Sequence, residues 1–141
     1  MPQIGQQIAP QSRIVYVDND PLVLVHARAL LTSVTGGRVD YVVADVRDPE
    51  TILQDAAETL DFSQPTAVMM LGVLGEIPDS DSPGAIVATQ LESLPARSYL
   101  AISDGTDTSP ALNQAIATYN QNVASPTICV ARSKSPPSST A

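Results

Sequence analysis

The sequence contains the same two-residue helix-start signal four times, an Asp or Ser followed by Pro. The four pairs are Asp20-Pro21, Asp48-Pro49, Ser82-Pro83 and Ser109-Pro110. A side-chain oxygen before a helix can accept a hydrogen bond from a free backbone N–H of the first turn. Proline suits that first turn because its missing N–H would have no partner there. Each pair therefore predicts that a helix begins at its proline.

Four short segments rich in apolar, β-branched and aromatic residues separate these helices, as buried strands would. They span residues 13–17, 39–44, 66–74 and 98–102. Alternating strands and helices form right-handed βαβ units around a parallel sheet. We therefore predict an α/β fold, a Rossmann-like three-layer sandwich with a mostly parallel sheet. Residues 66–74 are nearly all apolar, so we expect this strand to be covered on both faces.

Each predicted helix carries apolar residues at helical spacing, which indicates one face turned to the core. Gly36-Gly37 would end the first of them. The predicted faces are Val23, Ala27, Leu30, Leu31 and Val34; Ile52, Leu53, Ala56 and Leu60; Ile86, Val87 and Leu91; and Leu112, Ile116 and Tyr119.

The chain divides into three parts by composition. Residues 1–12 are polar and are expected to be a leader or the remnant of a helix. Residues 13–130 form the α/β domain. Residues 131–141 are rich in Ser and Pro, and we expect a disordered tail there.

Charge and cysteine content exclude several classes of function. The net charge is −8 with only seven Lys and Arg, which disfavours a general nucleic-acid surface. The single cysteine, Cys129, cannot form an internal disulfide and is expected to be a small, semi-buried apolar residue. No signal peptide is visible, and the longest apolar run, residues 67–74, is too short to span a membrane. We therefore expect a cytoplasmic protein without membrane contact.

Ligands of open parallel sheets bind beyond the carboxyl ends of the strands, and acidic residues gather at those ends here. Asp18 ends the first strand, where a carboxylate can accept both hydrogen bonds of a ribose diol. Asp45 ends the second strand, 27 positions later, and could accept the amino group of an adenine. Val46 could line the adenine or offer its backbone N–H. The alternative for both aspartates is a role in the turn alone, although Asp20 is better placed to cap the helix.

The other two strand ends give weaker signals. Gly72 and Gly75 follow the third strand and would let a ligand approach closely, and Ser103-Asp104 follow the fourth. Glu76 and Asp79 are candidate general bases, although loop carboxylates are usually just solvated. His26 falls off the apolar face of its helix, which favours a surface position. No metal-ligand spacing or Ser-His-Asp pattern stands out, so we expect no metal and name no catalytic residue.

At this point the sequence resembles a known family. The segments RIVYVDNDPLVLVHARALL, VVADVRDPETIL, LDFSQPTAVMMLGVLGEIPD and SYLAISDGT, in this order, are similar to the S-adenosyl methyltransferase family common in actinobacteria. The resemblance runs from about Gln6 to Ile128. It implies a class I methyltransferase fold, with S-adenosyl-L-methionine as cofactor and a methyl group passed by in-line displacement to an acceptor that the sequence does not identify. The implied cofactor-binding residues are Asp18 for the ribose, Asn19 next to it, Asp45 and Val46 for the adenine, and Leu71, Gly72 and Val73 beside the methionine.

The resemblance also implies that residues 13–130 are a partial methyltransferase domain, truncated at both ends. Family members have an earlier strand with a glycine-rich turn, and further strands after the last one here. They usually carry a His-aromatic pair where this chain has Gly75-Glu76, and Ser-His where it has Ser103-Asp104. The earlier strand lies mid-sheet in the family. We therefore expect residues 14–17 to pair directly with residues 68–71, and self-association through unpaired sheet edges.

Three other interpretations compete with an active enzyme. A phosphate-receiver domain would need about 40 residues between its acidic strands and a late Lys, but the only Lys is Lys134. A nicotinamide dehydrogenase half-domain would need a glycine-rich turn and leaves Asp45 unexplained. The strongest alternative is an inactive remnant or a binding module that keeps only the fold.

Overall fold

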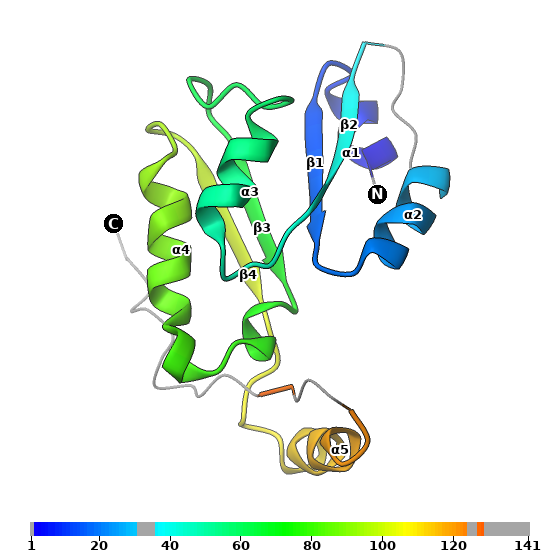
Figure 1. The fold of residues 1–141 in the computed structure, drawn as a ribbon, viewed down its shortest axis with the longest axis vertical. Helices are drawn as coiled ribbons and strands as arrows, with labels where there is room; N and C mark the ends of the chain where they lie inside the picture. The colour runs from blue at the N-terminus through cyan, green and yellow to red at the C-terminus, as the bar shows by residue number, and fades with distance from the viewer. Residues whose placement is uncertain (1, 31–35, 124–126, 129–141) are drawn as a thin grey trace. The chain divides into compact units, whose positions relative to one another are not determined.

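The computed structural model describes residues 2–30, 36–123 and 127–128. In these ranges helices and strands alternate, and two short 3₁₀ turns follow the third strand (Figure 1). The helices are α1 (Pro2–Ile8), α2 (Pro21–Leu30), α3 (Pro49–Ala56), α4 (Pro83–Glu92) and α5 (Pro110–Asn120). The strands are β1 (Arg13–Asp18), β2 (Arg38–Val43), β3 (Ala67–Leu71) and β4 (Tyr99–Ser103), and the 3₁₀ turns are η1 (Leu74–Glu76) and η2 (Asp79–Asp81). The alternating α/β order predicted from the sequence is confirmed.

All four proline-marked helices begin at the predicted proline. Asp48 caps α3, because one of its carboxylate oxygens accepts the N–H of Thr51 at 3.1 Å. The hydroxyl of Ser109 accepts the N–H of Leu112 at 3.4 Å and caps α5 in the same way. None of the helices in the described ranges is long and apolar enough to cross a membrane.

The chain separates into two compact units, which are described one at a time. The first comprises Met1–Thr66 with Gly84–Ser98, and the second comprises Ala67–Pro83 with Tyr99–Ala141. Each unit holds one parallel pair of strands, β1 with β2 in the first and β3 with β4 in the second.

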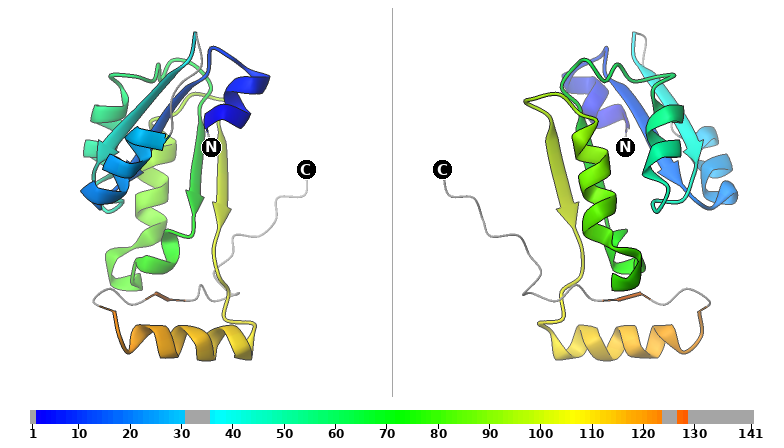
Figure 2. Two further views of the ribbon diagram at one scale, coloured as in Figure 1. Left: turned by 90° about the vertical axis from the view of Figure 1, so that its right-hand side faces the viewer. Right: turned by 60° about the vertical axis from the view of Figure 1, so that its left-hand side comes forward.

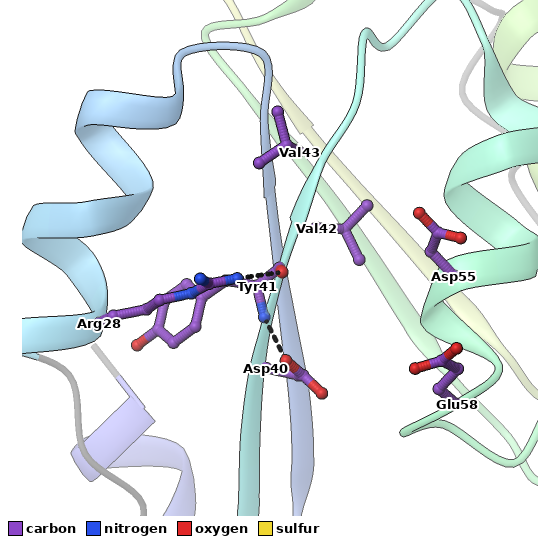
Figure 3. A pocket seen from close by; sticks show the side chains of 7 residues that line it. All are labelled: Arg28, Asp40, Tyr41, Val42, Val43, Asp55 and Glu58. Atoms are coloured by element: carbon purple, nitrogen blue, oxygen red, sulfur yellow. Dashed lines mark hydrogen bonds between the residues drawn. The ribbon is translucent and has the colours of Figure 1, made fainter.

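In the first unit, β1 and β2 pair in parallel from Arg13↔Arg38 to Asp18↔Val43. Side chains on the two faces of β2 turn toward different helices, α2 on one side and α3 on the other (Figure 3). Tyr41 lies on the α2 side, where its hydroxyl donates to the carbonyl of Ala27 at 3.2 Å. The core of this unit consists of Leu24, Tyr41, Val42, Ile52, Ala56 and Ile86.

A polar network joins the segment after α3 to the beginnings of both strands. Arg13 donates to the carbonyl of Thr59 at 3.0 Å, and Arg38 donates to the carbonyl of Glu58 at 3.2 Å. Arg38 also contacts Asp40 at 3.0 Å, and the buried hydroxyl of Thr59 donates to the same carboxylate oxygen at 2.9 Å. The network therefore anchors the segment after α3 to the two strands.

In the second unit, β3 and β4 run side by side in parallel, from Ala67↔Tyr99 to Leu71↔Ser103 (Figure 2). Met70 is buried, whereas Met69 and Leu71 are 65% and 59% exposed. The expectation that this strand is covered on both faces is therefore wrong for the described residues. It follows that half of its side chains face away from the packed side, as in a sheet with one open face.

The structure also corrects other predictions. The expected pairing of residues 14–17 with 68–71 is wrong: β1 pairs with β2, β3 pairs with β4, and no ladder joins β1 to β3 in the described ranges. Within each pair the two strands are joined by one helical crossover, through α2 or α4, which brings them side by side in parallel. In α2 the buried residue is Leu24, while Val23 and Leu30 of the predicted face are 47% and 73% exposed.

Some predictions remain open. Leu31, Val34, Cys129 and the tail at 131–141 lie outside the described residues.

In α3, Ile52 and Ala56 of the predicted face are buried. In α5, the predicted face is not buried, since Leu112 and Tyr119 are 38% and 56% exposed. His26 is exposed, as predicted.

Candidate functional site

Asp18 and Asp45 lie at the same edge of the first unit's sheet. Asp18 ends β1 opposite Val43 of the parallel partner strand, and Ala44 donates its N–H to the carbonyl of Asp18 at 3.2 Å. Asp45 is the next residue along the chain. Both carboxylates therefore stand at the carboxyl ends of adjacent parallel strands, where this class of fold binds ligands.

Asp20, and not Asp18, caps α2, as the sequence predicts. Asp20 accepts the N–H of Leu22 at 2.8 Å, which satisfies a free donor in the first turn of α2. Asp18 is half-buried, and one oxygen of its carboxylate accepts the N–H of Asp20 at 2.9 Å. The other oxygen accepts no hydrogen bond from any described residue. Helix capping therefore leaves part of the Asp18 carboxylate available to a ligand.

Asp45 is held by Arg47, a residue that sequence reasoning did not single out. Its Oδ1 accepts the backbone N–H and the Nε–H of Arg47, both at 2.9 Å, and its Oδ2 accepts an Nη2–H at 2.6 Å. These side-chain hydrogen bonds, followed by the backbone bond, lower the pKa of Asp45 to about 2. Asp45 is therefore ionised at neutral pH, with an oriented carboxylate.

The two residues beside these aspartates present their own polar groups. Val46 is half-buried, and its backbone N–H has no hydrogen-bond partner in the described ranges. Asn19 is exposed in the bend after β1. Capping of α3 falls to Asp48, which leaves the Asp45-Val46 dipeptide outside the helix start.

In the second unit, the end of β3 turns sharply at Gly72. This residue has a φ of 72°, which favours glycine, and its N–H donates to the carbonyl of Ser103 at 2.6 Å. Leu71 before it is exposed and Val73 after it is half-buried. Because Gly72 has no side chain, the turn presents only backbone at this position, at the carboxyl end of the strand.

The carboxylates after β3 and β4 are engaged within the second unit. Asp104 accepts the N–H of Leu74 at 3.1 Å and the N–H of Gly75 at 3.2 Å. Glu76 accepts the hydroxyl hydrogen of Thr127 at 2.6 Å. Sequence reasoning placed Asp104 at a strand end but missed this role, which only the fold of the loop reveals. Both carboxylates therefore hold loops of this unit in place.

The first unit also has an open pocket of about 340 Å³ along β2 (Figure 3). None of the residues predicted to bind a cofactor lines it. Its walls combine three carboxylates, one guanidinium and apolar strand residues: Arg28, Asp40, Tyr41, Val42, Val43, Asp55 and Glu58. No group of three or more metal-binding side chains occurs in the described part of the chain. We place the candidate site at the strand ends, because Arg28 and Asp40 of this pocket already bond to the protein.

The geometry at the strand ends can now be set beside known proteins. The sequence profile of a family described as S-adenosyl methyltransferase matches residues 1–135. The chain belongs to this family.

Two solved structures support the membership. A DUF574 family protein from Streptomyces avermitilis shares 37% identity and superposes with a TM-score of 0.86, over 94% of this chain and 52% of that one. A proposed methyltransferase from Thermobifida fusca shares 34% identity with a TM-score of 0.75, over 91% of this chain and 48% of that one. The search of curated proteins found no match. This S-adenosyl methyltransferase family member thus spans about half the length of the solved structures it matches.

Proposed function

We propose that this chain forms the adenosine-binding part of an S-adenosyl-L-methionine-dependent methyltransferase. The supporting observation is the register of β1 and β2, which sets Asp18 and Asp45 at one sheet edge. In the proposal, Asp18 with Asn19 binds the ribose hydroxyls, and Asp45 with Val46 binds the adenine. In the second unit, Leu71, Gly72 and Val73 are proposed to contact the methionine part of the cofactor.

The chemistry of these groups suits an adenosine. A ribose diol presents two donors, and Asp18 retains an oxygen that accepts nothing from the described residues. The adenine edge presents an amino donor next to a ring-nitrogen acceptor. Asp45 offers a carboxylate, and Val46 offers a backbone N–H without a partner in the described ranges. Donors and acceptors on the two sides therefore complement each other.

The reaction of the bound cofactor would be transfer of its sulfonium methyl group to a nucleophile. The chain's own contribution is to bind and orient, since positioning and exclusion of water supply much of the rate in such reactions. Neither Glu76 nor Asp104 is proposed as a base, because both are engaged within their own unit. The acceptor class stays undefined.

Calorimetric titration with S-adenosylhomocysteine tests the proposal. We expect wild-type protein to bind, and Asp18→Asn and Asp45→Asn each to weaken binding about tenfold or more, as loss of a hydrogen bond to a charged group would. Glu92→Gln is the control, since Glu92 is an exposed carboxylate in α4. Absence of heat with wild-type protein at millimolar ligand would refute the proposal.

A non-catalytic binding module is the second candidate function. The engagement of Glu76 and Asp104 favours it, because both carboxylates accept hydrogen bonds that hold the loops after β3 and β4. A protein that binds S-adenosylhomocysteine but transfers no methyl group to any nucleophile class offered would support this candidate.

A further inference from the structure

Arg47 binds Asp45 with a geometry that limits which further hydrogen bonds this carboxylate can accept. The guanidinium bonds through two different nitrogens, Nε to Oδ1 at 2.9 Å and Nη2 to Oδ2 at 2.6 Å. The backbone N–H of Arg47 adds a third bond, to Oδ1 at 2.9 Å. Such a two-pronged pairing fixes the plane of the carboxylate as well as its position.

The bonds are distributed unevenly over the two oxygens. An ionised carboxylate has about four lone-pair sites, two on each oxygen. Arg47 occupies both sites of Oδ1 and one site of Oδ2. One acceptor site on Oδ2 remains, so Asp45 can accept one further hydrogen bond with a defined direction. A neutral amine would take this remaining site, because it cannot displace charge-assisted bonds that are roughly twice as strong.

We propose that Arg47 is the positioning residue through which this chain selects an amino group at the purine 6-position, by presenting a single free acceptor site of Asp45. The inference rests on the proposed function, because it assumes that Asp45 meets the adenine. It assigns to Arg47 a role in ligand selection that does not require Arg47 to touch the ligand.

The alternative is an ordinary surface ion pair within a loop. The side chains of Arg47 and Asp45 are 54% and 34% exposed, and such pairs contribute little to stability. Both interpretations therefore predict the same modest change in unfolding free energy for variants of Arg47, so stability does not separate them. They differ in one measurable property, the discrimination between ligands with and without the amino group.

The experiment compares two ligands by calorimetry. One is S-adenosylhomocysteine, and the other is its purine analogue with hydrogen in place of the 6-amino group. The variants are Arg47→Gln, which loses the charge and the fork, and Arg47→Lys, which keeps only the charge. Arg97→Gln is the matched control, because Arg97 is an exposed arginine for which the described residues show no bond.

We expect wild-type and Arg97→Gln proteins to prefer the amino ligand about tenfold. In Arg47→Gln this preference should fall to about twofold, with Arg47→Lys in between and the affinity for the purine analogue changed little. Full discrimination in Arg47→Gln would overturn the role of Arg47 and leave the proposed function standing. Equal binding of both ligands by wild type would overturn the role of Arg47 and also the contact between Asp45 and the adenine amino group, while cofactor binding itself would stand. No binding of either ligand by wild type would overturn both.

Discussion

The hydroxyl of Thr59 donates a hydrogen bond to Oδ2 of Asp40 at 2.9 Å, although Thr59 follows α3 and Asp40 lies within β2. Thr59 is only 1% exposed, so this bond connects a buried hydroxyl to a carboxylate on the sheet. The same oxygen of Asp40 also accepts from Arg38. This bond joins a side chain of the segment after α3 to the sheet, whereas Arg13 and Arg38 reach that segment through its backbone carbonyls.

Replacing Thr59 by Val removes this bond and keeps the shape of the side chain. We expect Thr59→Val to lower the free energy of unfolding by about 1–2 kcal/mol, because the lost partner is a charged group. Urea unfolding measures the loss. Thr51→Val serves as comparison, since the hydroxyl of Thr51 bonds to an exposed carboxylate and should contribute less. Equal losses in the two variants would contradict the importance of the Asp40 contact.

The stability of the protein should fall in acid through a defined group of aspartates. Hydrogen bonds from Arg47 lower the pKa of Asp45 to about 2, and those from the Tyr41 N–H and Thr59 lower the pKa of Asp40. A carboxyl with a lowered folded pKa stabilises the fold above its unfolded pKa of about 3.9. That contribution disappears as the pH falls through the folded pKa.

We therefore expect the contribution of Asp40 and Asp45 to the unfolding free energy to be full above about pH 5 and to decrease from about pH 4 toward pH 2. Carbon-13 titration of the Asp45 carboxyl should give a midpoint of about 2, and Arg47→Gln should move it toward the ordinary value. A midpoint near that of an isolated aspartate in wild-type protein would show that the Arg47 contact is absent in solution.

The sequence predicted what depends on local chemistry. All four helix starts were correct because a first-turn proline acts within one turn of the chain, and Asp20, Asp48 and Ser109 add a capping oxygen to three of them. Placing Asp18 and Asp45 at one edge followed from parallel alternation alone. Asp20 as the cap of α2 followed from its position next to Pro21.

What depends on distant partners could not be predicted. Leu24, and not Val23, is buried in α2 because helix rotation is set by packing on the strands, which a periodic pattern only approximates. The bonds of Asp104 to the N–H groups of Leu74 and Gly75 depend on loop geometry about 30 residues away in sequence. The hydrogen bonds between Arg47 and Asp45 are local, so the Asp-x-Arg spacing could have suggested them.

Gly75 has no room for a side chain. A methyl group there would lie 2.7 Å from the carbonyl oxygen of Ile128 and 3.0 Å from Oδ1 of Asp104. We expect Gly75→Ala to destabilise the protein by about 1–3 kcal/mol, because backbone must shift to relieve the overlap. Gly84→Ala is the control, since nothing lies within 4 Å of its added methyl in α4 and alanine favours helix. Thermal unfolding that ranks Gly75→Ala at or above Gly84→Ala would contradict this packing.

At the centre of β2, two side chains cover the backbone groups that point away from β1. Arg38 and Ala44 donate their N–H groups to the carbonyls of Ser12 and Asp18, so the alternate residue Tyr41 directs its backbone away from β1. The N–H of Tyr41 donates to its neighbour Asp40 at 2.9 Å, and its carbonyl accepts from Arg28 at 3.2 Å. Exposed strand edges are templates for association, and these two side chains cover this one.

Opening this edge should promote self-association. Arg28→Ala frees the carbonyl of Tyr41, and one additional inter-chain hydrogen bond of about 1 kcal/mol corresponds to a roughly fivefold tighter association. Sedimentation over a range of concentrations measures it. Arg97→Ala makes the same change in net charge without touching β2, so any difference between the two variants reports on the edge itself. If both variants sediment alike, the contact between Arg28 and Tyr41 does not limit association through β2, and any self-association uses another strand edge.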